Sequence, residues 1–127
     1  MSNYLACVIT HGALAGSLKA VVEKLVAQAP ELHCFSNQES DIEAIGSAIQ
    51  DLVENRKPDK IIIFVDLMGG SCWLSANRLK HFDENITIAA GVNLPMLVSY
   101  CVNYERLKWP ELLIKIEADA QKGIIVK

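Results

Sequence analysis

A histidine and an aspartate each stand at the end of a strongly apolar stretch of the sequence. Residues 4–10 are followed by His11 and Gly12, and the run 60–66 ends in Asp66 itself. A carboxylate that accepts the proton of one imidazole nitrogen fixes the tautomer and leaves the lone pair of the other nitrogen free. We therefore expect His11 and Asp66 to be the catalytic pair, with the histidine acting as a nucleophile or a general base.

A glycine turn after Asp66 predicts a place for an anion. Gly69 and Gly70 allow the backbone to turn sharply and to approach a ligand closely, and Ser71 is a natural N-cap for the helix expected next. Unpaired N–H groups at a helix N-terminus favour negative charge. This setting favours a phosphohistidine intermediate over hydrolysis, for which the sequence offers neither a second acid nor a nucleophilic serine motif.

Ordinary structural roles compete with these interpretations. A histidine after a strand often caps or packs, and an aspartate before two glycines often only forms a turn. His33, inside a strand pattern, and His81, at a helix end, are interpreted as structural. Cys72 is either a reactive thiol or a buried residue at a helix start. A zinc site made of His11, Asp66 and Cys72 is conceivable, but no ligand spacing supports it, and we predict neither a metal nor an organic cofactor.

Strands and helices alternate along the chain. Apolar runs predict strands, and amphipathic stripes predict helices packed on a sheet. The predicted strands cover residues 4–10, 32–35, 60–66, 86–91 and 124–126; the predicted helices lie within residues 13–28, 40–55, 72–80, 95–101 and 110–123. This order predicts an α/β, doubly wound, mostly parallel sheet with helices on both faces. Right-handed crossovers favour the strand order 2-1-3-4, with a short C-terminal fifth strand, so that His11 and Asp66 meet at the carboxyl edge.

Length and composition exclude several classes of protein. The 127 residues form one predicted domain, 1–127, and 51% hydrophobic content fits a fully covered sheet. A net charge of −3 without a basic stripe argues against nucleic acid as a partner. The apolar runs are far shorter than the roughly 20 residues of a membrane span, and no signal peptide is recognisable. Four widely spaced cysteines do not suggest a disulfide framework. We expect a soluble, cytoplasmic protein.

Three stretches resemble a known family. Thr10-His11-Gly12, Phe64-Val65-Asp66-Leu67-Met68-Gly69-Gly70-Ser71 and Ala90-Gly91-Val92-Asn93-Leu94-Pro95-Met96-Leu97 are similar to the signature stretches of the IIA component of the mannose-family, phosphoenolpyruvate-dependent sugar phosphotransferase system. The motifs keep the order and spacing of the family over essentially the whole chain. The family usually has proline after Gly-Gly-Ser, whereas this chain has Cys72-Trp73, which could alter the rim of the site or the face that docks the acceptor.

The resemblance implies specific roles. His11 would accept a phosphoryl group from the histidine phosphocarrier protein and pass it to a IIB domain, Asp66 would orient the imidazole, and Ser71, with Gly12 and Gly70, would bind the phosphate. Family members are commonly homodimers that exchange their final strand, a role that residues 124–126 could fill. Two other functions stay open: a regulatory module whose phosphorylation controls a protein partner without sugar transport, and the related phosphocarrier subunit that serves dihydroxyacetone kinase.

Overall fold

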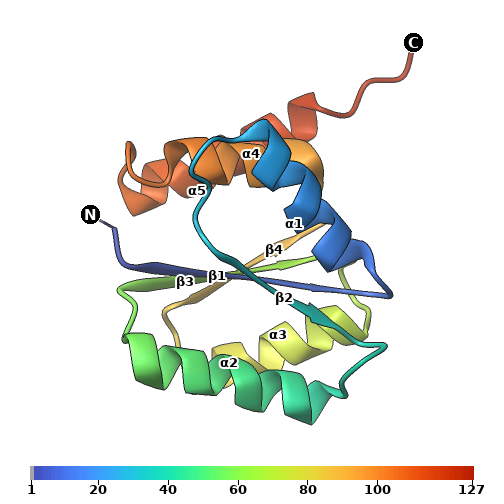
Figure 1. The fold of residues 1–127 in the computed structure, drawn as a ribbon, viewed down its shortest axis with the longest axis vertical. Coiled ribbons are helices and arrows are strands. Elements are labelled where there is room, and N and C mark those ends of the chain that lie inside the picture. Colours follow the sequence, from blue (N-terminus) through green and yellow to red (C-terminus); the bar gives the residue numbers. More distant parts are fainter. Residues whose placement is uncertain (1) are drawn as a thin grey trace.

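The computed structural model, which describes residues 2–127, contains one parallel four-stranded sheet with helices on both faces (Figure 1). The strand order is β2-β1-β3-β4, and every neighbouring pair is parallel. This is the predicted doubly wound order. The elements are β1 (Tyr4–Thr10), α1 (Leu14–Leu25), β2 (Leu32–Ser36), α2 (Ile42–Arg56), β3 (Lys60–Val65), α3 (Ser71–Phe82), β4 (Ile86–Ala90), α4 (Leu94–Asn103) and α5 (Trp109–Lys122).

The two central strands, β1 and β3, are continuously apolar because helices cover both faces of the sheet. Helices α1, α4 and α5 cover one face of the sheet, and α2 and α3 cover the other (Figure 1). Alternate residues of β3 therefore enter two different cores: Ile62 and Phe64 pack under α4 and α5, whereas Ile63 and Val65 pack against α2 and α3. Both faces must be apolar, which removes the polar alternation of a half-exposed strand.

The predicted fifth strand is wrong. Residues 124–126 form no strand and belong to no sheet; they extend away from the domain after α5 (Figure 1). All three side chains are at least 69% exposed. A strand requires a neighbouring strand edge for its backbone N–H and C=O groups, and this tail meets none within the described part of its own chain, residues 2–127.

Helix boundaries differ from the predicted caps in two places. The N-cap of α3 is Gly70 rather than Ser71, which is already the first helical residue. The N-cap of α2 is Asp41, whose Oδ1 accepts a hydrogen bond of 2.8 Å from the backbone N of Ala44. The expected capping box began one residue earlier, at Ser40, but the aspartate side chain satisfies the helix N-terminus directly.

Gly123 is the C-cap of α5, as predicted. Glycine is needed here because a side chain would not fit, and not because the backbone is left-handed. Its φ of −74° is ordinary for a right-handed residue. A Cβ at this position would lie 2.5 Å from Cγ of Pro95, which stands in the first turn of α4. Only glycine therefore lets the end of α5 pack this closely against the start of α4.

Candidate active site

The carboxyl ends of the two central strands bring His11 and Asp66 into contact. His11 follows β1 directly, and Asp66 follows β3 directly. These strands are parallel neighbours in a register that pairs Ile9 with Val65, so both loops open at the same edge of the sheet. The Nδ1 atom of His11 lies 2.9 Å from Oδ2 of Asp66, and the backbone N of His11 donates to the same oxygen at 2.8 Å.

The ionised state of Asp66 determines which nitrogen of His11 carries the proton. Burial alone would raise the pKa of this carboxyl, but hydrogen bonds from the backbone and ring of His11 and from the backbone N of Leu67 outweigh it and lower the pKa. An ionised carboxylate only accepts hydrogen bonds. The proton of the neutral imidazole therefore resides on Nδ1, and the lone pair of Nε2 is free.

The glycine turn faces the free nitrogen. A Cβ built on Gly70 would lie 3.4 Å from Cε1 and 3.9 Å from Nε2 of His11, so this backbone passes beside the Cε1–Nε2 edge of the ring. Gly69 has a φ of +89°, the left-handed region that favours glycine. The glycines thus serve two needs, a left-handed turn at Gly69 and close approach to the imidazole at Gly70.

The N-terminus of α3 is better prepared for an anion than that of α1. In α1, the backbone N of Leu14 donates to the carbonyl of His11, and that of Ala15 donates to Oγ1 of Thr10 at 2.7 Å. In α3, no side chain caps the helix, and within residues 2–127 the backbone N–H groups of Ser71, Cys72 and Trp73 have no acceptor; the N–H of Leu74 donates to the carbonyl of Gly70. The sequence suggested both helix termini, whereas the structure favours α3.

The other predicted phosphate ligands, Gly12 and Ser71, directly follow His11 and Gly70 in the chain. Gly12 has a φ of +56°, and its carbonyl oxygen accepts a hydrogen bond of 2.7 Å from Oγ of Ser36. Ser71 Oγ accepts a hydrogen bond of 3.2 Å from Nδ2 of Asn37. His33 and His81 lie elsewhere, on β2 and near the end of α3.

Asn37 also lies at the candidate site, beside Ser71, and no sequence motif predicted it there. It follows β2, and its backbone N donates to the carbonyl of Thr10, which extends the pairing of β2 with β1 to the edge of the site. The sequence showed only a polar break at Ser36-Asn37-Gln38. The strand order could have predicted its position. Strand β2 is also a neighbour of β1, so the loop after β2 opens at the same carboxyl edge.

Cys72 lies under the imidazole. Its side chain is buried, and Sγ is 3.8 Å from Nδ1 of His11. Burial first, and the negative charge of Asp66 second, raise the pKa of the thiol. These surroundings match the prediction of a buried residue at a helix start rather than a reactive thiolate. All four cysteines are free, as expected from their spacing.

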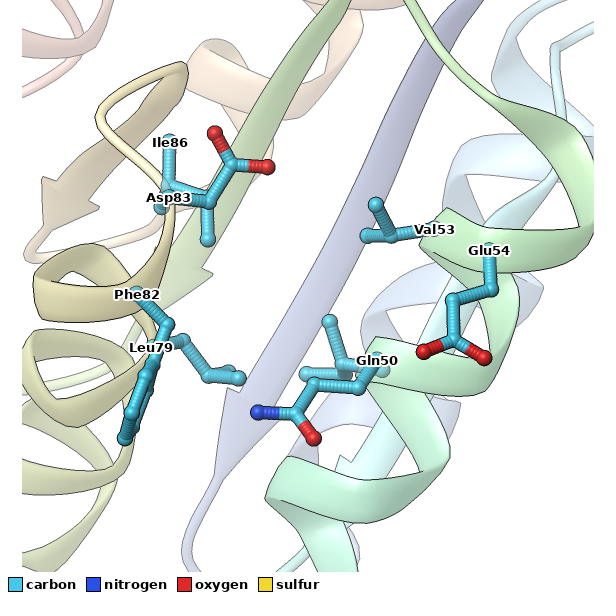
Figure 2. Close-up of a pocket in the computed structure, with 8 residues that line it drawn as sticks. Gln50, Val53, Glu54, Leu79, Phe82, Asp83 and Ile86 are labelled. Atoms are coloured by element: carbon cyan, nitrogen blue, oxygen red, sulfur yellow. The ribbon is translucent and has the colours of Figure 1, made fainter.

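His11 is displayed at the surface. Its side chain is 48% exposed, while that of Asp66 is only 11% exposed. The apolar cavity of about 190 Å³ between α2 and α3 in Figure 2 does not include the histidine. Its lining consists of Ile49, Gln50, Val53, Glu54, Leu79, Phe82, Asp83 and Ile86. The site is therefore an exposed imidazole held by a mostly buried carboxylate, and a large partner can reach it. None of the helices described for residues 2–127 is long and apolar enough to cross a membrane.

The fold and site define a parallel α/β domain that carries an exposed, carboxylate-held histidine at the carboxyl edge of its sheet. The family model of the EIIA-man family, described as "PTS system fructose IIA component", matches residues 6–117. That match covers most of the chain. The chain therefore belongs to the mannose-type IIA components of the sugar phosphotransferase system.

Individual relatives agree with this assignment. A sorbose-specific EIIA component from Lacticaseibacillus casei is 23% identical over 123 residues, 94% of this chain and 89% of the relative. A fructose-specific EIIA component from Bacillus subtilis is 30% identical over 79 residues, which span 62% of this chain and 52% of that relative. The crystal structure of an EIIA component from Streptococcus agalactiae shares the fold, with a TM-score of 0.84 and 20% identity over 97% of this chain and 96% of that one.

Proposed function

We propose that the chain is a phosphoryl relay that accepts phosphate on Nε2 of His11 from the histidine phosphocarrier protein and passes it to a IIB domain in the cytoplasm. The observation that carries the proposal is the pair of contacts from His11 to Oδ2 of Asp66, at 2.8 and 2.9 Å. They fix the ring and its proton on the inner side and leave Nε2 as the outward nucleophile.

The transfer step follows from this arrangement. The Nε2 lone pair attacks phosphorus in line, a new N–P bond forms, and the N–P bond of the donor breaks, returning its electron pair to the donor imidazole. The proton on Nδ1 of His11 stays in place. Positive charge that develops on the ring is stabilised by the carboxylate of Asp66, which needs no reorganisation because it already accepts that proton. Transfer to the IIB domain is the reverse step with a new acceptor.

The turn around α3 supplies the groups that would hold the phosphoryl oxygens. We assign this role to the backbone amides of Gly12 and Gly70 and to the amide and hydroxyl of Ser71. The free amides at the α3 N-terminus support the assignment, since they point positive charge toward the place where negative charge accumulates. Asn37 would keep the Ser71 hydroxyl oriented, because it donates to that oxygen and leaves the hydroxyl proton for the phosphate.

Protein partners fit the surface better than a small free substrate. Beside the site, Leu67 is 60% exposed and Met68 is 77% exposed. Exposed apolar side chains that lie together beside a functional group are typical of a surface that docks a protein. This observation supports donor and acceptor proteins that bring their own phosphorylated or acceptor side chain to His11.

The test is intact-mass analysis after incubation with phosphoenolpyruvate, enzyme I and the histidine phosphocarrier. We expect one acid-labile phosphoryl adduct on the chain, unchanged in His81→Ala and absent in His11→Ala. An adduct that persists in His11→Ala would contradict the assignment of the nucleophile. An adduct that forms but is not discharged by any IIB domain, together with a partner that distinguishes the phosphorylated from the free form, would favour the regulatory alternative. Discharge to a dihydroxyacetone kinase system would favour the third function.

We also propose that two chains form a homodimer by exchanging residues 124–126. Strand β4 is one of the two edge strands of the sheet and, within residues 2–127, pairs only with β3. A groove of about 220 Å³ runs beside it, lined by residues of β4, α4 and α5. The exposed tail of Ile124, Ile125 and Val126 has the strand-forming composition that an unpaired edge accepts.

Sedimentation velocity tests the exchange. We expect a dimer for the full chain and a monomer for a variant that ends at Gly123. A monomeric full chain at concentrations well above those in the assay, or a dimeric shortened variant, would contradict the exchange.

A further inference from the structure

Three different types of metal ligand meet beneath the ring of His11. One ligand atom each from His11, Asp66 and Cys72 lies within 4.8 Å of the other two. The Nδ1 atom is 2.9 Å from Oδ2 of Asp66 and 3.8 Å from Sγ of Cys72. The three residues come from the end of β1, the end of β3 and the first turn of α3. The three residues belong to different elements, and only the tertiary fold brings them together.

The distances suit a tetrahedral zinc site. Zinc bonds of about 2.0 Å to nitrogen and oxygen and about 2.3 Å to sulfur separate ligand atoms by roughly 3.3–3.6 Å. The two separations from Nδ1 lie just below and just above this range, and no two of the ligand atoms are more than 4.8 Å apart, so side-chain rotations would bring all three within reach of one ion. Three protein ligands leave the fourth tetrahedral position to water. We propose that His11, Asp66 and Cys72 form an inhibitory zinc(II) site.

The donor set selects the class of metal. Imidazole, carboxylate and thiolate together suit zinc and other borderline divalent ions, whereas Mg²⁺ and Ca²⁺ prefer oxygen ligands alone. On binding, zinc displaces the proton of the Cys72 thiol, which is released to solvent. The carboxylate of Asp66 exchanges its hydrogen bond with Nδ1 for a bond to the metal and keeps the hydrogen bond from the backbone N of His11.

Zinc bound to Nδ1 would prevent His11 from acting as a nucleophile. In the metal-free site the ring proton is on Nδ1, and Nε2 holds the lone pair. A metal on Nδ1 requires the other neutral tautomer, with the proton on Nε2. That nitrogen then has no lone pair for phosphorus, so zinc and a phosphoryl group exclude each other. This regulatory consequence rests on the proposed relay through His11, whereas the metal site itself does not.

Cobalt(II), a spectroscopic substitute for zinc, tests the ligands without an activity assay. We expect the purified chain to give a thiolate-to-cobalt charge-transfer band and tetrahedral d–d bands, both displaced by added zinc. Cys72→Ser should remove the charge-transfer band. His11→Gln, at an exposed position that tolerates replacement, should weaken cobalt binding at least about tenfold. Cys34→Ser is the matched control and should leave the spectra unchanged.

Two results would overturn the site. One is the absence of these bands in the unaltered chain, and the other is a charge-transfer band that survives in Cys72→Ser. Long-range proton–nitrogen NMR of the imidazole tests the tautomer: zinc should move the proton of His11 from Nδ1 to Nε2, and an unmoved proton would refute inhibition. A chain that is never phosphorylated, with or without zinc, would instead refute the relay while the cobalt spectra still decide the metal site.

Discussion

Oδ2 of Asp66 accepts two hydrogen bonds from one residue, the backbone N and the ring Nδ1 of His11. The other carboxylate oxygen, Oδ1, accepts from the backbone N of Leu67. The same side chain therefore connects the two strand-end loops and holds the imidazole ring of His11. Removing it should affect catalysis more than folding.

Replacement of Asp66 by alanine separates the two contributions. We expect the phosphorylation rate to fall about 10–100-fold, because the ring loses its fixed orientation and its countercharge. The free energy of unfolding should fall by only about 1–3 kcal/mol, the range expected when hydrogen-bonded amides lose their acceptor. A quenched time course of phosphorylation measures the rate, and urea unfolding measures the free energy of unfolding. An unfolded Asp66→Ala chain would argue that this residue is structural rather than orienting.

A methyl group on Gly70 should obstruct phosphoryl transfer without disturbing the fold. The φ of this residue is −87°, which alanine accepts, and the nearest atom to a new Cβ would be Cε1 of His11 at 3.4 Å. The methyl group would stand beside Nε2, so we expect a rate about tenfold lower or more and a nearly unchanged melting temperature. An unimpaired Gly70→Ala chain would show that the phosphoryl group approaches from the other side of the ring.

Asn37 and Ser71 should act as one unit. Asn37 Nδ2 donates to Ser71 Oγ at 3.2 Å. Each single change to alanine is expected to slow phosphorylation about 2–10-fold, which corresponds to one hydrogen bond of modest strength. Because the two residues share one interaction, the double variant should be little slower than the worse single variant. Additive losses would mean that Asn37 contacts a partner or the phosphate independently of Ser71.

His33 should make folding stability depend on pH. Burial first, and the positive charge of Arg56 second, lower the pKa of this histidine in the folded chain, and its Nε2 is buried without a hydrogen-bond partner. The unfolded chain then binds a proton more readily, so this contribution is fully present above the unfolded pKa of about 6.5 and is lost as the pH falls toward the folded pKa. The free energy of unfolding should decrease on acidification from pH 7, with a slope below about 1.4 kcal/mol per pH unit from this group.

Chemical denaturation between pH 7.5 and 5.5, a window of about two units around the ordinary histidine pKa, tests this expectation. The His33→Phe variant should show a flatter profile, because phenylalanine fills similar space without a titrating nitrogen. An equal slope in both proteins would assign the dependence to other groups.

Periodicity and residue type were sufficient to predict the sheet. The continuous apolar runs of β1 and β3 reflect burial on both faces, and the alternation with amphipathic helices left few topologies. The same reasoning placed His11 and Asp66 at one edge. It misplaced the cap of α3 by one residue, because Gly70 and Ser71 both suit an N-cap and only the backbone path distinguishes them. It also predicted a fifth strand from composition, although a strand exists only where a partner edge is available.

The sequence by itself determined the alternation of strands and helices along the chain, the histidine and aspartate at the strand ends, and the family motifs, because each depends on local residue type and spacing. Tertiary structure decided how the loops meet. It brought Asn37 into contact with Ser71, 34 positions further along the chain, and Cys72 into contact with His11, 61 positions earlier. Such contacts depend on sheet register and on the exact path of each loop, and no local pattern encodes them.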